Sequence, residues 1–172
     1  MNTAGKGFEK MLQPRILNAE EAAGDLCPQQ HDFRRGRSTI GAVKEATDAI
    51  TRAQTGNHRS RGITLLVTFD DKNAFNSARW TEFLKGLNNF AVPKHLMRVM
   101  RSYLSDRMLL YDTLQGKKSR KVTAGADQGS ILGPDLWNIS CDGILRLELV
   151  DGCFMIGYAD EIALVIVARK SQ

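Results

Sequence analysis

Hydrophobic residues three and four positions apart recur along this chain of 172 residues and predict five helices. In chain order, the predicted helices cover residues 6–20, start after Ser38 or Thr39, after Ser77 and at Pro93, and cover Asp135–Leu149. The first helix has a weak pattern that Pro14 interrupts. The second carries its apolar residues at helical spacing, namely Ile40, Val43, Ala46, Ile50 and Ala53.

Continuous runs of β-branched and aromatic residues predict the strands. Ile63–Asp70 reads ITLLVTFD, which suits a buried strand. Phe154–Val167 holds two such runs around Tyr158-Ala159-Asp160-Glu161, which predicts a β-hairpin with two carboxylates at its tip. Arg107–Leu114 and Lys118–Thr123 are expected to pair across Gln115-Gly116. The chain shows no internal repeat, so we expect one α+β domain.

The composition is that of an ordinary globular protein, with 42% hydrophobic and 25% charged residues. The longest apolar run, Ile162–Ala168, is too short to span a membrane, and no apolar segment typical of a signal peptide follows Lys6 or Lys10. The three cysteines form no CxxC motif or Cys/His cluster and are typical of reduced thiols. We therefore expect an intracellular protein without a membrane partner.

Positive charge is concentrated in two segments. The net charge is +5, and residues 34–61 alone carry seven Arg and Lys against two acidic residues. A second cluster consists of Lys117, Lys118, Arg120 and Lys121. Such asymmetry is typical of polyanion binding, and a solvated surface explains it equally well.

Carboxylates and a glycine-containing loop supply the candidate chemistry. Asp70 ends one predicted strand, and Asp160 lies at the tip of the predicted hairpin. Carboxylates from two strands, together with water and phosphate oxygens, suit Mg²⁺ ions that activate a hydroxyl and stabilise a leaving pyrophosphate. The loop 125–134 allows close backbone approach to a ligand and offers Gln128 and Ser130 as hydrogen-bonding groups. Taken singly, each feature also fits a plain role as a solvated turn, a cap or a connection.

Four motifs occur in order along the chain. They are Gln30–Thr39 (QHDFRRGRST), Phe69–Ser77 (FDDKNAFNS), Gln128–Pro134 (QGSILGP) and Tyr158–Glu161 (YADE). In this order they resemble the fingers motif Q-x-G-F-R-x-G-R-S-T and motifs A, B and C of reverse transcriptases from non-LTR, LINE-like retrotransposons of the insect type-1 group. The resemblance implies an α+β polymerase palm, an antiparallel sheet backed by helices, with part of the fingers and no thumb. Residues 1–62 would then be fingers-like and residues 63–172 palm.

The resemblance also implies roles for individual residues in an RNA-directed DNA polymerase that uses two Mg²⁺ ions, with Mn²⁺ as an alternative. Asp70 and Asp160 would bind the metals with the main-chain carbonyl of Asp71, and Glu161 occupies the other catalytic acidic position. Phe75 matches the steric gate against a ribose 2′-hydroxyl; Phe75 and Tyr158 also fit ordinary core aromatics. The resemblance further implies nucleotide binding by Gln128, Gly129, Ser130, Arg34 and Arg37. It implies nucleic-acid binding by Lys117, Lys118, Arg120 and Lys121.

The implied partners are an RNA template, a DNA primer, deoxynucleoside triphosphates and the remaining parts of the element's polyprotein, within the nucleus. Glu161 stands where motif C has a second aspartate, Asp127 replaces the motif B proline, Asp32 replaces a glycine of the fingers motif, and Asp71 replaces an apolar residue. The chain also ends soon after motif C. These departures leave an alternative, a partial domain that binds nucleic acid without catalysis.

Overall fold

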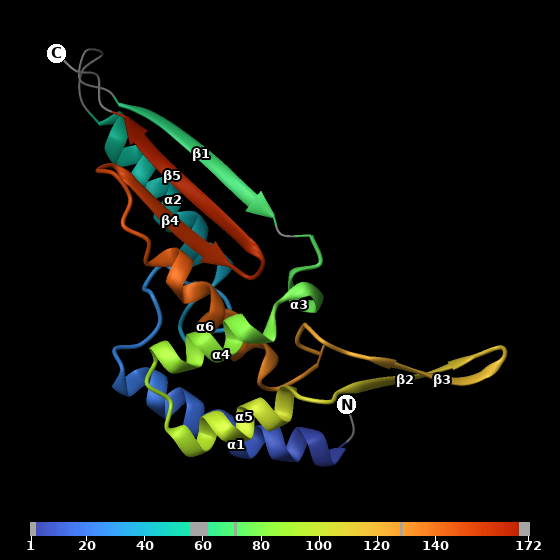
Figure 1. Cartoon of the computed structure of the whole chain (residues 1–172). Helices are drawn as coiled ribbons and strands as arrows, with labels where there is room; N and C mark the ends of the chain where they lie inside the picture. The colour runs from blue at the N-terminus through green and yellow to red at the C-terminus, as the bar shows by residue number, and fades with distance from the viewer. Residues whose placement is uncertain (1–2, 56–61, 71, 128, 169–172) are drawn as a thin grey trace. The chain divides into compact units, whose positions relative to one another are not determined.

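The computed structural model describes residues 3–55, 62–70, 72–127 and 129–168, and these form two compact units. The first unit combines Met1–Leu26 with Asn73–Cys141, and the second combines Cys27–Lys72 with Asp142–Gln172. This division differs from the expected fingers-like and palm segments, which stay a prediction. Helices and antiparallel strands are mixed along the chain (Figure 1), so the α+β class is confirmed.

The second unit is built on an antiparallel sheet with the strand order β1-β5-β4. Its strands are β1 (Ile63–Asp70), β4 (Cys153–Tyr158) and β5 (Glu161–Ala168). Helix α2 (Thr39–Gln54) lies along one face of this sheet (Figure 1). The Ser38 hydroxyl caps α2 by accepting a hydrogen bond from the Gly41 amide, as the sequence predicted.

In the second unit the predicted burial of β1 is wrong, and the buried face of α2 agrees only in part with the residues at helical spacing. Strand β1 has the predicted bounds, but it is an edge strand that pairs only with β5, and its residues are largely exposed. Helix α2 packs on the sheet through Ala42 and Ala49, which contact the cluster of Ile156 and Val165. The larger residues Ile40 and Val43 are 80% and 57% exposed. Ala46, one of the residues at the expected spacing, is partly buried against the same cluster.

In the first unit, four helices share one apolar core. They are α1 (Thr3–Ala22), α4 (Trp80–Asn89), α5 (Lys94–Leu104) and the beginning of α6 (Gly133–Leu145). Fully buried members of this core come from all four, namely Ile16, Phe83, Leu87, Met100, Leu136 and Ile139. None of the described helices combines the length and hydrophobicity that a membrane crossing requires.

Three helices differ from the prediction, and one of them is α6, which begins at Gly133 and ends at Leu145 rather than covering Asp135–Leu149. Pro14 lies inside α1 and does not interrupt it, since packing of Leu12 and Ile16 on the core holds the helix together despite the lost amide. Ser77 does not cap α4; it ends the short helix α3 (Ala74–Ser77), and α4 starts after Arg79.

Strands β2 (Met108–Thr113) and β3 (Gly116–Lys121) form the predicted second hairpin, which extends away from the helices of its own unit (Figure 1). All residues of β3 and nearly all of β2 are exposed. The hairpin therefore contributes surface rather than core.

Candidate active site

The end of the three-stranded sheet gathers the predicted acidic residues. A two-residue turn, Ala159-Asp160, joins β4 to β5 and places Tyr158 opposite Glu161. On the other side of β5, Asp70 is paired with the same Glu161. Directly paired residues of an antiparallel sheet project from the same face with Cβ atoms about 4.5–5.5 Å apart. Asp70 and Glu161 thus present two like charges side by side, with Asp160 in the adjoining turn.

No cation balances these carboxylates within the described part of the chain. The side chains of Asp70, Asp160 and Glu161 form no hydrogen bond or ion pair with any residue that the structure describes, and Asp70 and Glu161 are exposed. Adjacent like charges are unfavourable unless a counter-ion reaches them. The donor set consists of hard oxygen atoms, which fits Mg²⁺.

The carboxylates do not form a preassembled protein cage. Over the described residues, no three side chains of the His, Cys, Asp and Glu types converge closely enough to hold a metal. Proteins usually bind Mg²⁺ through one or two carboxylates with substrate phosphates and water completing the shell. Two further predicted site residues, Asp71 and Gln128, lie outside the described residues.

Asp32 adds a fourth acidic group beside the hairpin turn. Burial raises the pKa of the Asp32 carboxyl, the backbone hydrogen bond at Phe33 lowers it, and the nearby Asp160 carboxylate raises it. Asp32 replaces a glycine of the fingers motif, and its φ is not positive. The left-handed conformation falls instead on Phe33, at φ +51°. The substitution therefore changes charge near Asp160 without backbone strain at position 32.

The first unit brings Phe75 together with the loop that contains the motif B residues. The Ala126 amide donates to the Phe75 carbonyl (2.8 Å), and the Gly125 amide donates to the Ala78 carbonyl (2.7 Å). The Phe75 ring contacts the ring of Trp137 in α6, with centroids 4.9 Å apart. Phe75 is half-buried, so part of its ring remains accessible to a ligand.

Gly125 shows why this loop contains glycine. Its φ is +86°, and a Cβ at this position would lie 2.6 Å from the backbone carbonyl oxygen of Asn76. A side chain would therefore push the loop away from the segment that carries Phe75.

Glu9 is a site residue that the sequence analysis missed. This fully buried carboxylate of α1 accepts hydrogen bonds from the Ser130 hydroxyl (2.9 Å), the Ile131 amide (2.7 Å) and the Tyr103 hydroxyl. Burial, followed by the hydrogen bond to Glu9, raises the pKa of Tyr103 to about 12. A charged residue in helical register with the buried Leu12 was the available signal.

Ser130 is therefore held within the protein. Its hydroxyl donates to Glu9 and accepts from the Gly133 amide (3.0 Å). Gly129 precedes it with φ +78°. Roles of Gly129 and Ser130 in nucleotide binding stay predictions, and the observed bonds assign Ser130 to shaping the loop.

The extra charge of Asp127 is neutralised locally. Its carboxylate pairs with the Arg107 guanidinium, which also lies 5.1 Å from the centre of the Tyr103 ring. Replacement of the motif B proline by Asp127 therefore adds an ion pair rather than a free negative charge.

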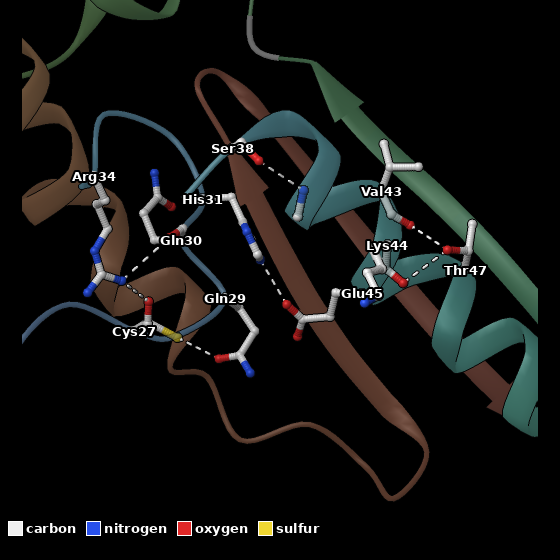
Figure 2. Close-up of polar contacts among 11 residues, drawn as sticks. Cys27, Gln29, Gln30, His31, Arg34, Ser38, Val43, Lys44, Glu45 and Thr47 are labelled. Carbon is white, nitrogen blue, oxygen red and sulfur yellow. Dashed lines mark hydrogen bonds and ion pairs between the residues drawn. The ribbon is translucent and has the colours of Figure 1, made fainter. Parts of the chain in front are cut away.

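The predicted basic residues fall into two kinds. Arg34 is half-buried, and its guanidinium donates to the backbone carbonyls of Cys27 (2.9 Å) and Gln30 (3.4 Å), as Figure 2 shows. Arg37 is exposed. The four basic residues of the β2–β3 hairpin, Lys117, Lys118, Arg120 and Lys121, are also exposed. Arg34 thus braces its own loop, whereas the others are available to phosphates.

Comparison with known proteins gives one family. The sequence model described as "Reverse transcriptase (RNA-dependent DNA polymerase)" matches residues 1–172. A 115 kDa protein of the type-1 retrotransposable element R1DM of Drosophila melanogaster is 30% identical over 161 residues, which are 92% of this chain and 15% of that protein. The retrovirus-related Pol polyprotein of the type-1 element R1 of Bradysia coprophila is 26% identical over 174 residues, 99% of this chain and 16% of the polyprotein.

A solved structure shares the fold. The telomerase of Candida tropicalis, determined with a TWJ fragment of telomeric RNA, aligns with a TM-score of 0.64 at 11% sequence identity. The alignment covers 91% of this chain and 28% of the telomerase chain. This likeness supports the predicted polymerase palm-type fold. The chain corresponds to only a small part of each of these larger proteins.

Proposed function

Because the chain belongs to the reverse transcriptase (RNA-dependent DNA polymerase) family, we propose that it copies RNA into DNA as part of a non-LTR retrotransposon protein. The reaction would be nucleotidyl transfer from a deoxynucleoside triphosphate to the 3′-hydroxyl of a primer. The observation that carries this proposal is the pairing of Asp70 with Glu161 beside the Asp160 turn. This pairing concentrates uncompensated negative charge at one end of the sheet.

In this proposal the acidic residues bind divalent cations. Asp70 and Asp160 would bind two Mg²⁺ ions, with Mn²⁺ as a substitute, and the backbone carbonyl of Asp71 would add a ligand. When bound, such ions lower the pKa of the attacking hydroxyl and neutralise charge on the leaving pyrophosphate. Glu161 keeps its carboxylate at the adjoining position, and its side chain reaches one methylene further than the family's aspartate. The protein contributes positioning and a negative potential rather than covalent chemistry.

The remaining partners follow from the same assignment. The template would be RNA, the primer DNA, and the other segments of the element's polyprotein would complete the enzyme. A protein that copies its element into chromosomal DNA would act in the nucleus.

Primer extension on an RNA template tests the proposal directly. The chain is mixed with a DNA primer annealed to RNA, deoxynucleoside triphosphates and Mg²⁺, and extended primer is measured against a reaction with chelator. Extension that depends on Mg²⁺ supports the polymerase. Template–primer binding without extension by this chain would favour the alternative, a nucleic-acid-binding domain without catalysis. Glu161 motivates that alternative, because catalytic geometry tolerates only small displacements.

Phe75→Ala is expected to relax sugar selection. Removing the ring opens space for a ribose 2′-hydroxyl, and loss of such a steric clash changes selectivity by roughly 10- to 200-fold. The measurement is the ratio of kcat/KM for a deoxynucleotide to that for the matching ribonucleotide. Because it is a ratio, it does not depend on the fraction of active protein. Phe8→Ala, which removes another partly exposed ring of the same unit, serves as the control. An unchanged ratio in Phe75→Ala would contradict the assignment of Phe75 as the steric gate.

The β2–β3 hairpin combines basic and apolar side chains on one face. Pairing places Tyr111 opposite Lys118 and Leu109 opposite Arg120, and these pairs share a face. All four residues are exposed. Basic side chains beside an aromatic ring suit contact with both the phosphates and the bases of a nucleic acid. We propose this face as a template–primer contact.

The double variant Lys118→Ala/Arg120→Ala is expected to weaken template–primer binding and its salt dependence together. Each lost phosphate contact lowers the slope of log K against log salt by about one, so the slope should fall by about two. Fluorescence anisotropy over a range of salt concentrations gives both quantities. Lys94→Ala/Arg98→Ala removes the same charge from the exposed side of α5. Equal effects of the two double variants would mean that only net charge matters.

A further inference from the structure

A short segment of the fingers motif runs alongside the strand that leads into the acidic turn. We call this segment, residues Gln29–Asp32, the strap. The Gly157 amide donates to the Gln29 carbonyl, and the His31 amide donates to the Gly157 carbonyl, both at 2.9 Å. Gln30 and Gly157 thus form a parallel bridge. Gly157 lies three residues before Asp160, so the strap is bonded directly to the base of the turn.

Gly157 allows the strap to lie in close contact with β4. A Cβ at this position would lie 2.4 Å from the Gln30 Oε1 atom and 2.9 Å from the Leu145 Cδ1 atom. Gln30 itself is only 2% exposed. The missing side chain at position 157 therefore leaves the space that the buried Gln30 side chain fills.

The strap is anchored to α2 by a pair formed between the buried His31 and the partly exposed Glu45. The His31 ring is 4% exposed, and its Nε2 atom lies 2.8 Å from the Glu45 Oε2 atom (Figure 2). On the other side, the Arg34 guanidinium bonds the carbonyls of Cys27 and Gln30 and closes the loop that holds the strap (Figure 2). Helix α2, the strap and β4 are thus linked in one chain of bonds within the second unit.

The acidic turn needs such support because its backbone is strained. Ala159 has φ +53°, in the left-handed region that favours glycine. A non-glycine residue in this region is strained and persists only where the surroundings hold it in place. Small displacements of a catalytic carboxylate have large effects on rate and on metal binding.

We propose that the strap is a positioning device for Asp160, in which Gln30, His31 and Glu45 are positioning residues that fix the turn against α2. This inference rests on the proposed function, since it assigns the turn to metal binding. The Asp160 carboxylate acts on the Asp32 carboxyl at the end of the strap, which supports their proximity. The parallel direction of the strap explains this proximity, because both segments continue from the bridge toward the same end of the sheet.

Variants of Glu45 test the inference without changing the acidic turn. Glu45→Ala removes the acceptor of the His31 ring, Glu45→Gln keeps an acceptor of the same reach, and Asp48→Ala removes a charge from an exposed position of the same helix. The probe is Mn²⁺ alone, with its affinity measured by electron paramagnetic resonance on the full 172-residue chain. Loss of a supporting bond behind a metal ligand is expected to weaken Mn²⁺ binding about tenfold in Glu45→Ala. Glu45→Gln should recover most of this loss, and Asp48→Ala should match the wild type.

Hydrogen exchange of the His31 and Gly157 amides provides the second readout. Both amides should exchange faster in Glu45→Ala than in Asp48→Ala, because they form the bonds between the strap and β4. Gly157→Ala should act in the same direction on Mn²⁺ affinity by displacing Gln30.

The outcomes separate this inference from the proposed function. Faster exchange in Glu45→Ala with unchanged Mn²⁺ affinity would overturn the inference alone, because the strap would then be structural only. Equal Mn²⁺ affinity and equal exchange in Glu45→Ala and wild type would overturn it as well. Absence of Mn²⁺ binding by the wild-type chain would also overturn the inference, whereas Mg²⁺-dependent primer extension tests the proposed function separately.

Discussion

Asp70→Asn is expected to lower Mg²⁺-dependent primer extension about a thousandfold while template–primer affinity stays unchanged. The amide has nearly the shape of the carboxylate, but it no longer neutralises a divalent cation. A metal site contributes several kcal/mol of transition-state stabilisation, and about 4 kcal/mol corresponds to a factor of about a thousand. Single-turnover extension at saturating nucleotide measures the chemical step.

The stability of the same variant distinguishes this explanation from a folding defect. Asp70 is paired with Glu161, and like charges directly opposite in a sheet are destabilising. Removing one charge should therefore raise the free energy of unfolding by about 0.5 kcal/mol in the absence of metal. Urea denaturation in chelator measures it. Asp112→Asn, at an exposed acidic residue of β2, is the control for both assays. Extension by Asp70→Asn at the wild-type rate would contradict the metal assignment.

The sequence placed the strands correctly because long β-branched runs have few alternative structures. The bounds of β1 are those predicted, and the hairpin of β4 and β5 exceeds the predicted segment Phe154–Val167 by one residue at each end. The residue directly opposite Asp70 could not be predicted, because register depends on the length of a turn and on the pairing of strands distant in sequence. The two-residue turn places Glu161, rather than Asp160, in that position. Glu161, the departure from motif C, is thus paired with Asp70. Its longer side chain projects from the same face of the sheet as the Asp70 side chain.

Burial was less predictable than the positions of elements. Hydrophobic spacing in α2 marked Ile40 and Val43, yet alanines face the sheet. Spacing identifies a periodicity but not which of two apolar faces finds a partner. The same reason applies to β1, whose composition indicates a central strand although it lies at the edge.

The hydrogen-bond partners of polar residues in the core were not predictable from the sequence. His31 was read only as part of a motif, and Glu9 only as one residue of a weak helix. Both are buried and bonded to residues far away in the sequence, Glu45 and Ser130 respectively. No local pattern encodes such pairs. Of these two residues, Glu9 has the larger expected effect on the free energy of unfolding.

Glu9→Leu is expected to lower the free energy of unfolding by about 3 kcal/mol. The leucine leaves the Ser130 hydroxyl, the Ile131 amide and the Tyr103 hydroxyl without their acceptor, and each unsatisfied buried group costs about 1–3 kcal/mol. Apolar burial of the new side chain offsets part of this loss. For a chain of this size, the change lowers Tm by roughly 6–12 °C. Urea denaturation with an unchanged m value measures the loss.

A matched substitution and a double-mutant cycle show whether the effect belongs to these hydrogen bonds. Glu21→Leu makes the same change at an exposed position of α1 and should leave stability nearly unchanged. If Glu9 acts through Ser130, then Ser130→Ala should cost less in the Glu9→Leu background than in the wild type, because the bond is already lost. Additive losses would mean that the two residues act independently. Glu9 would then stabilise the core without holding the loop that follows Gly129.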